Sequence, residues 1–178
     1  MIAVKTVFRE WVEGDLEAVR DITWRTWLDA YSSFIPQDDL RSYFDLHYST
    51  ESLRLLARNP DVRGFICIVD ERPAGVLRSF FDREKGRFYV SSLYILPAYQ
   101  RSGIGSRLMA MAEEQATTLG HTEIWLGVMT QNLPALDWYR RHGFMFVEEL
   151  PFTMGGTTVQ HLIGFRKVGV LSWRNHVD

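Results

Sequence analysis

The sequence predicts an α/β protein with a mixed, largely antiparallel sheet of about seven strands flanked by helices. The 178 residues, 46% of them apolar, fit one domain with a sizeable core better than two, so we expect residues 1–178 to form a single domain. Three consecutive strand-like runs are separated by turns short enough for antiparallel hairpins. A later strand, helix and strand form a crossover connection, which makes that pair of strands parallel.

The chain begins with one strand and one helix. Residues 2–12 are typical of a strand, and Gly14-Asp15 offers a turn and an N-cap for a helix that continues to about Tyr31. The helical pattern breaks at Pro36. We therefore expect the next element to start after that proline.

Two further helices and a meander of strands follow. Asp38 can cap a helix through about Tyr48, and a third helix starts at Ser49 or Thr50 and stops before Asn59-Pro60. The strand-like runs then cover 63–70, 73–82 and 86–96. The meander is expected to form the antiparallel part of the sheet.

The C-terminal half supplies the parallel pair and the last hairpin. A helix over 103–119 leads to a strand over 123–130, and a short helix follows over 133–142. Two final strands, 144–152 and 158–168, meet at a Gly155-Gly156 turn, and residues 169–178 form a tail with no assigned use.

Composition narrows the range of partners. A net charge of -2 without a Lys/Arg run gives no reason to expect nucleic acid binding. The N-terminus has no signal-peptide core, and no apolar run is long enough to span a membrane, so we expect no membrane partner and a cytoplasmic location. The single cysteine, Cys67, lies in an apolar strand and is interpreted as a buried thiol without a role.

One turn between a strand and a helix carries two glycines where an anion could bind. A helix N-terminus has unpaired N–H groups and partial positive charge, and glycines let a backbone approach a phosphate closely. A dinucleotide fingerprint would need a third glycine where Leu108 stands, and a Walker loop would need a lysine. An ordinary turn remains the alternative. The segment is Gln100-Arg101-Ser102-Gly103-Ile104-Gly105.

Three segments together resemble the GCN5-related N-acetyltransferase (GNAT) family. Residues 100–105 match the family signature Q/R-x-x-G-x-G/A without a gap. The strand before it, with Leu93 and Ile95 ahead of Pro97, is similar in spacing and order. So is the later stretch NLPALDWYRRHGF at 132–144, and only residues 88 to 147 carry these specific motifs.

The resemblance implies an enzyme that uses acetyl-CoA as its cosubstrate and needs no metal. It implies that the parallel strands splay, that the main chain of the first strand holds the pantetheine arm and acetyl carbonyl, and that the turn's N–H groups hold the pyrophosphate. Core packing of the strand's side chains is compatible with this, and Asn132 also fits the N-cap of the 133–142 helix. The cofactor-binding residues implied are Leu93, Tyr94, Ile95, Gln100, Arg101, Ser102, Gly103, Ile104, Gly105, Ser106 and Asn132.

By the same resemblance, Tyr139 is the catalytic residue. Attack of an amine on a thioester requires a thiolate to leave, and a phenol beside the sulfur can donate a proton or hydrogen bond. Its position in the helix also fits a core aromatic residue. The attacking amine must lose a proton, and no base is assigned. The candidates are Asp29, Glu148, Glu149, His161 and a chain of water molecules.

The predicted reaction is direct transfer of acetyl to a primary amine of a small molecule within a ternary complex. Residues 23–40 resemble a bacterial subgroup that includes PaiA-type polyamine acetyltransferases, and Asp29, Asp38 and Asp39 could attract a polyamine-like cation. These acids also fit an ordinary solvated surface. The alternatives are a protein N-terminal or lysine acetyltransferase and a non-catalytic CoA-binding regulatory module. Either a monomer or a homodimer fits the sequence.

Overall fold

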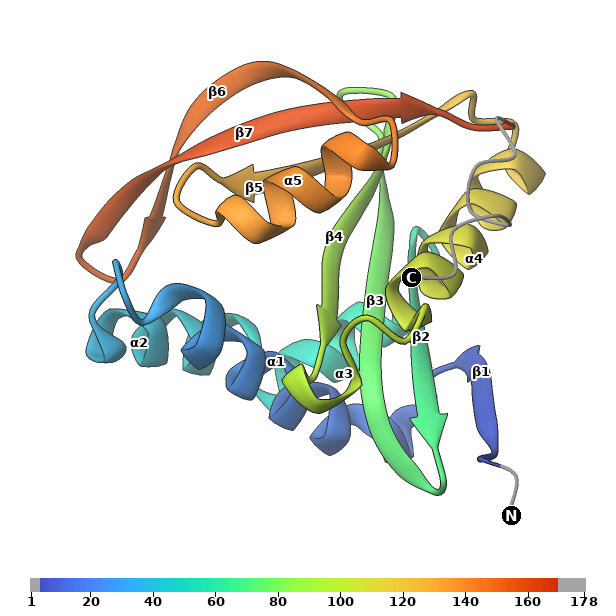
Figure 1. Ribbon diagram of the computed structural model, residues 1–178, viewed down its shortest axis with the longest axis horizontal. Coiled ribbons are helices and arrows are strands. Elements are labelled where there is room, and N and C mark those ends of the chain that lie inside the picture. Colours follow the sequence, from blue (N-terminus) through green and yellow to red (C-terminus); the bar gives the residue numbers. More distant parts are fainter. Residues whose placement is uncertain (1–3, 170–178) are drawn as a thin grey trace.

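The computed structural model describes residues 4–169, and they form one seven-stranded mixed sheet with helices on both faces (Figure 1). The strand order is β1-β2-β3-β4-β5-β7-β6, and every neighbouring pair is antiparallel except β4 and β5. The predicted fold class is therefore confirmed. The strands are β1 (Thr6–Glu10), β2 (Val62–Val69), β3 (Arg72–Asp82), β4 (Arg87–Ile95), β5 (Glu123–Met129), β6 (Met145–Met154) and β7 (Thr157–Lys167).

The helices agree with the predicted ones to within a few residues. Ser49 caps α3 by accepting the N–H of Ser52, as expected, but α2 begins at Gln37, so Asp38 lies in its first turn and is not its cap. The expected tail over 169–178 lies outside the described residues apart from Gly169. The helical segments are η1 (Glu13–Asp15), α1 (Leu16–Tyr31), α2 (Gln37–His47), α3 (Thr50–Arg58), η2 (Pro97–Tyr99), α4 (Ile104–Thr118) and α5 (Leu133–Arg141).

β4 and β5 pair only where the two strands begin. Their register covers Phe88–Val90 opposite Ile124–Leu126, and beyond it the strands diverge (Figure 1). A bulge explains the divergence: Ser79 lies opposite Val90 while Arg78 lies opposite Ser92, so Ser91 is an extra residue in β4. Because a bulge bends its strand, β4 turns away from β5 immediately after their last paired residues.

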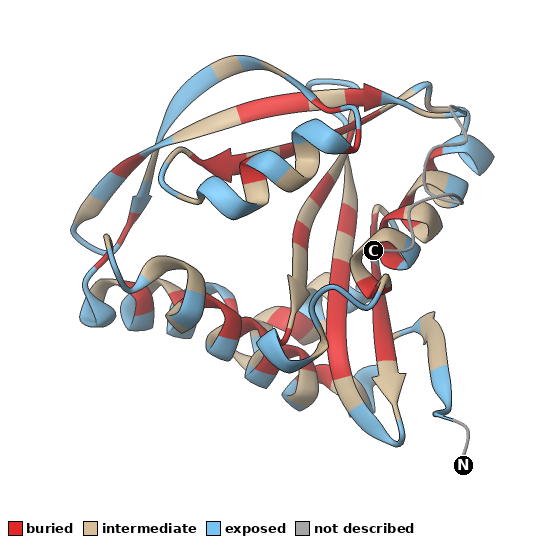
Figure 2. Ribbon diagram, viewed as in Figure 1, coloured by how far each residue is buried: buried red, intermediate tan, exposed pale blue. Residues whose placement is uncertain are grey.

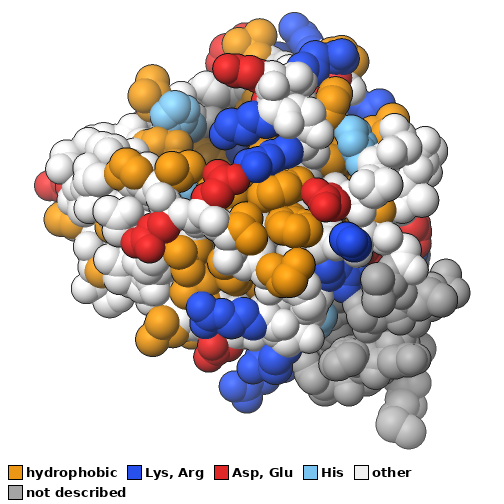
Figure 3. Space-filling model, turned by 90° about the horizontal axis from the view of Figure 1, so that it is seen from above, with side chains coloured by type: hydrophobic (Ala, Val, Ile, Leu, Met, Phe, Trp, Pro, Cys, Tyr) orange, Lys and Arg blue, Asp and Glu red, His pale blue; other side chains and the backbone are white. Residues whose placement is uncertain are grey.

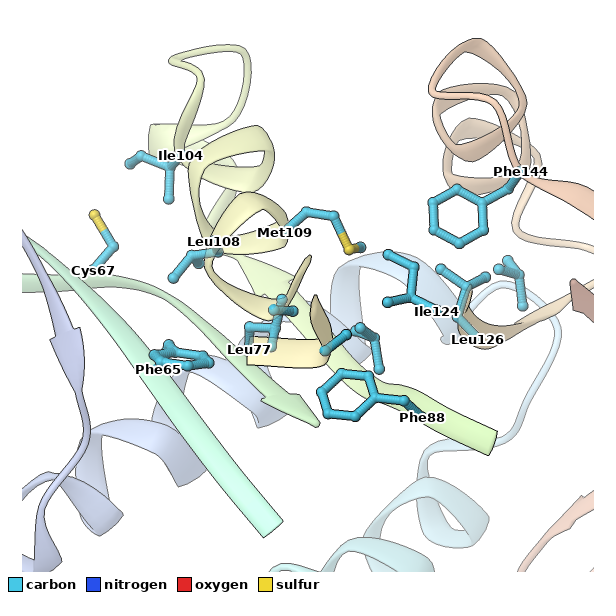
Figure 4. Close-up of a cluster of buried hydrophobic side chains, with 14 of the residues drawn as sticks. Phe65, Cys67, Leu77, Phe88, Ile104, Leu108, Met109, Ile124, Leu126 and Phe144 are labelled. Atoms are coloured by element: carbon cyan, nitrogen blue, oxygen red, sulfur yellow. The ribbon is translucent and has the colours of Figure 1, made fainter. Parts of the chain in front are cut away.

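Each face of the sheet buries its own apolar cluster. The side chains between the sheet and α4 and α5 interdigitate around Leu77, Phe88 and Leu108 (Figure 4). A second cluster, centred on Trp27 and Leu40, packs α1, α2 and α3 against the opposite face. Because both faces are covered, residues 74–77 of β3 are all buried, whereas burial alternates along the first part of β4 (Figure 2). β4 and β5 therefore separate between these two apolar clusters.

Cys67 lies in the cluster on the α4 side and is fully buried. Burial raises the pKa of its thiol to about 11, so the thiol stays protonated near neutral pH. This agrees with the prediction of a buried thiol.

The surface mixes both signs of charge. Viewed from above, apolar side chains gather in the middle of the face among Lys, Arg, Asp and Glu (Figure 3). The edge strand β6 contributes exposed Met145, Val147 and Leu150. Within residues 4–169, no helix combines the length and apolar character needed to cross a bilayer.

Candidate active site

β4 presents an unpaired backbone edge in the gap where it leaves β5. The N–H of Leu96 donates to the carbonyl of Ala74 in β3. Successive residues of a strand point their main-chain groups alternately to its two sides, so those of Leu93 and Ile95 point away from β3 and toward the gap. Their side chains pack on the α4 side. Both expectations for these residues are therefore compatible: apolar side chains fill the core while backbone groups stay available to a ligand.

The turn into α4 gathers unpaired N–H groups beside this edge. The first hydrogen bond of the helix runs from the N–H of Arg107 to the carbonyl of Gly103, so the N–H groups of Ile104, Gly105 and Ser106 have no acceptor within the helix. Arg101 and Gly103 have φ of 60° and 78°, which curves the backbone around the helix start. Such a concave run of amides at a helix N-terminus fits a phosphate anion.

The two glycines of the turn serve different purposes. Gly103 needs its positive φ, whereas Gly105 is helical, and a Cβ there would lie 3.5 Å from Cζ2 of Trp138 and 3.9 Å from Cγ1 of Ile95. These are ordinary contact distances. The position therefore accepts a methyl group, but a longer side chain would fill the space between α4, α5 and β4. The bare turn fits the pyrophosphate of acetyl-CoA.

Two polar side chains of the motif shape the turn from within. Nε2 of Gln100 donates to the carbonyl of Ile95 at 3.1 Å, and Oγ of Ser102 donates to the carbonyl of Tyr99. The Ile95 carbonyl therefore has one of its lone pairs already engaged. Arg101 is exposed, and Ser106 is half-buried in the first turn of α4.

Tyr139 lies on α5, with its ring edge-on to Phe144 at 5.4 Å between centroids. It packs against the same apolar cluster as Leu93 and Ile95. Burial raises the pKa of Tyr139, and the nearby Tyr31 hydroxyl raises it further. The phenol is therefore neutral near pH 7 and able to donate a proton.

Tyr31 and the side chain of Tyr94 also belong to this region, and sequence reasoning did not single them out for a role there. Burial, with a smaller effect of Tyr48, raises the pKa of Tyr31 to about 12, although hydrogen bonds with Tyr94 and Asn132 act to lower it. From the sequence, Tyr31 was only the expected end of the first helix, and the tertiary packing of α1 brings it to Asn132. The expected main-chain role of Tyr94 is not favoured, because its backbone faces Val76 of β3.

Asn132 caps α5, since its side-chain oxygen accepts the N–H of Ala135 at 3.4 Å. Asn132 thus has the N-cap role that the sequence also allowed. A contact with the cofactor arm stays a prediction.

The acids expected to attract a cation do not converge on the gap. Asp39 accepts the N–H of Gly156 at 2.8 Å and the hydroxyl of Thr157 at 2.6 Å, which ties α2 to the β6–β7 turn. These bonds lower the pKa of Asp39. Asp29 and Asp38 are exposed on their helices.

The base candidates separate clearly by environment. Glu148 is paired with Nη2 of Arg87 at 2.7 Å, which lowers its pKa, and Glu149 is exposed. His161 lies over Gly127, and its ring is 5.1 Å from that of Phe152. Burial lowers the pKa of His161, against a hydrogen bond with the Gly127 backbone, so its imidazole is neutral near pH 7. Of the four, His161 is the half-buried neutral base.

Comparison with known proteins finds similar sequences and a similar fold. The family model described as acetyltransferase (GNAT) family matches residues 16–144, which is more than half of the chain. An uncharacterized N-acetyltransferase of Lactobacillus delbrueckii subsp. lactis is 23% identical over 149 residues, covering 80% of this chain and 86% of that protein. The spermine/spermidine N(1)-acetyltransferase of Bacillus subtilis (strain 168) is 29% identical over 82 residues, covering 46% of this chain and 54% of its own length.

Among solved structures, the fold is similar to the PaiA N-acetyltransferase from Thermoplasma acidophilum in complex with coenzyme A. The TM-score is 0.79 at 22% identity, over 92% of this chain and 99% of that one.

Proposed function

The chain belongs to the acetyltransferase (GNAT) family, and from this premise we propose that it transfers acetyl from acetyl-CoA to a primary amine of a small molecule by direct attack in a ternary complex. N-acetyltransferase relatives support acetyl-CoA-dependent acetyl transfer as its activity. The class of acceptor and the roles of individual residues are proposals.

One observation carries this proposal. The free edge of β4 lies where the Ser91 bulge turns that strand from β5, the unpaired amides at the start of α4 follow this strand, and Tyr139 packs against the same apolar cluster as Leu93 and Ile95. An anion site, a polar edge for an extended arm and a neutral acid within one region are what thioester aminolysis requires. We propose that Arg101–Ser106 hold the pyrophosphate through their N–H groups and that Leu93 and Ile95 hold the arm.

The proposed chemistry needs two proton movements. A nitrogen–carbon bond forms as the amine attacks the thioester carbonyl, and the carbon–sulfur bond then breaks. Tyr139 donates its proton or a hydrogen bond to the departing sulfur. An alkyl ammonium has a pKa of roughly 10.4, so the acceptor must first give up a proton, for which His161 or water is available.

Polyamines are a second candidate class of acceptor. The support comes from the Bacillus subtilis relative named for spermine and spermidine, which aligns with less than half of this chain. The acidic residues do not add to it, because Asp39 is engaged by the β6–β7 turn and Asp29 and Asp38 are exposed.

A panel of primary amines tests the proposal. The purified chain is incubated with acetyl-CoA and each amine, and thiol release is followed together with mass spectrometry of the acetylated amine. We expect amine-dependent release of thiol that matches the acetylated product in amount. CoA binding without turnover on any amine or peptide would instead favour the non-catalytic module, and turnover on peptide amines alone would favour a protein acetyltransferase.

A further inference from the structure

Arg78 of β3 places a cationic group on the face of the sheet that α1, α2 and α3 cover. Alternation along β3 puts its side chain on the same face as Val76, which packs with α1, α2 and α3. Nε of Arg78 donates to Oγ of Ser91, the bulge residue, at 3.0 Å. Nη2 donates to the hydroxyl of Tyr48 at 3.3 Å, so the guanidinium is held from two sides.

Within residues 4–169, Arg78 differs from every other arginine that is not exposed. Each of the others is paired with a carboxylate, whereas Arg78 belongs to no ion pair of this part of the chain. Its Nη1 is buried and has no hydrogen-bond acceptor among these residues. The paired arginines are Arg9, Arg20, Arg54, Arg87 and Arg166.

A buried donor without an acceptor is costly. Leaving such a group unsatisfied destabilises the fold, and the effect is larger for a charged group. Native structures therefore satisfy nearly all buried polar atoms, and an exception points to a missing ligand or water. An arginine fork matches a carboxylate in shape and charge.

The position of Arg78 connects it to the reacting region. Tyr48, which contacts its Nη2, also shares a hydrogen bond of 3.1 Å with Ser92, two residues before Tyr94 in β4. Two residues of strand span roughly 7 Å, which is within the length of an amino acid side chain. Tyr94 in turn contacts Tyr31 beside Asn132. Hydrogen bonds through Tyr48 and Ser92 thus link Arg78 to the part of β4 that borders the gap.

We propose that Arg78 is a specificity-determining residue that binds a carboxylate of the acceptor, so the preferred acceptor is an amino acid with a reactive primary amine and not a simple polyamine. This inference rests on the proposed acetyl transfer to a small amine and names its acceptor class. Nη1 of Arg78 donates to the carboxylate, while Nε and Nη2 keep their bonds to Ser91 and Tyr48, and the amine of the same molecule lies at the gap.

Matched acceptors test the inference. Lysine and cadaverine share one chain and differ by the carboxylate, as do 4-aminobutyrate and propylamine. For the wild-type chain, we expect kcat/KM to be about ten- to a hundredfold higher for the carboxylated member of a pair, the effect of one charge-assisted hydrogen bond. Arg78→Met should remove this preference and leave the plain amine nearly unaffected, while Arg78→Lys keeps part of it.

Controls separate specificity from stability and from the proposed function. Arg63→Met removes an exposed arginine of the neighbouring strand and should keep the wild-type preference. If Arg78→Met fails to fold, the inference is still tested by the wild-type ratio of kcat/KM between the carboxylated and the plain amine, and by the same ratio in Arg78→Lys. Plain amines acetylated at least as well as their carboxylated partners would overturn the inference while the proposed function stands. No turnover on any amine would overturn the proposed function, and the inference with it.

Discussion

At the scale of single residues, the site depends on phenols that stay neutral. Tyr139 and Tyr31 are held in surroundings that disfavour the phenolate, which raises the pKa of each. A neutral phenol can donate to a sulfur on which negative charge develops, and a phenolate cannot. A phenol is already neutral near pH 7 because its ordinary pKa is about 10, and burial keeps Tyr139 neutral at higher pH as well.

Replacing Tyr139 by phenylalanine keeps the ring contact with Phe144 and removes the proton. If the hydroxyl acts mainly in the transition state, kcat and kcat/KM should fall together, by about ten- to a thousandfold. Affinity for acetyl-CoA should change little. The measurement is steady-state kinetics with a good acceptor. Single-turnover data establish that chemistry limits the rate.

A purely structural Tyr139 predicts a different result. The variant would then keep its turnover and lose at most roughly 1 kcal/mol of stability from an absent hydrogen bond. Unchanged kcat under rate-limiting chemistry would remove Tyr139 from the mechanism.

His161 makes stability depend on pH in a defined direction. Because burial lowers its pKa in the folded chain, the unfolded chain binds more protons between that value and about 6.5. The stability contribution is fully present above pH 6.5 and is lost as the pH falls through the pKa of the folded state. His161→Gln should therefore lose less Tm than the wild type between pH 7.5 and 5.5. Equal losses in the two chains would show that His161 does not titrate in this way.

At the scale of elements, the anion site at the N-terminus of α4 can be tested by substitutions that leave the sheet unchanged. Gly105→Glu places a carboxylate where the amides of Ile104–Ser106 should meet an anion, so CoA binding should weaken by at least tenfold. Gly105→Ala is the matched control, because its Cβ meets Trp138 at 3.5 Å and fits. Titration calorimetry with CoA compares the two, with circular dichroism to establish folding. A folded glutamate variant that binds CoA as tightly as the alanine variant would contradict the anion site.

Elements were predicted well because their signals are local. Ser49 caps α3, and the turns of the meander fall where short breaks separate the strand runs. Asp38 was predicted wrongly as a cap, because Pro36, at the N-cap position with an extended backbone, lets the helix begin two residues earlier. Asp39, whose hydrogen bonds reach Gly156 and Thr157, had no local signal for that role.

At the scale of the whole molecule, the site depends on contacts between distant segments. The match to the family motif placed the turn at 100–105 in the sequence, and the hydrophobic pattern predicted a parallel strand pair. The pattern could not show that Ser91 would bulge, since a bulge depends on the register with β3. Nor could it bring together Arg78, Tyr48 and Ser92, which come from three elements. These tertiary contacts are the ones that suggest which acceptor the site prefers.

The central claim is that CoA binds in the gap between β4 and β5 with its pyrophosphate on the start of α4. Hydrogen–deuterium exchange of the whole chain, with and without CoA, tests this claim most directly. We predict slower exchange for the amides of Leu93 and Ile95 and of Ile104–Ser106, with little change in α2 and α3. Unchanged exchange in these segments, together with protection elsewhere on the sheet, would contradict the account.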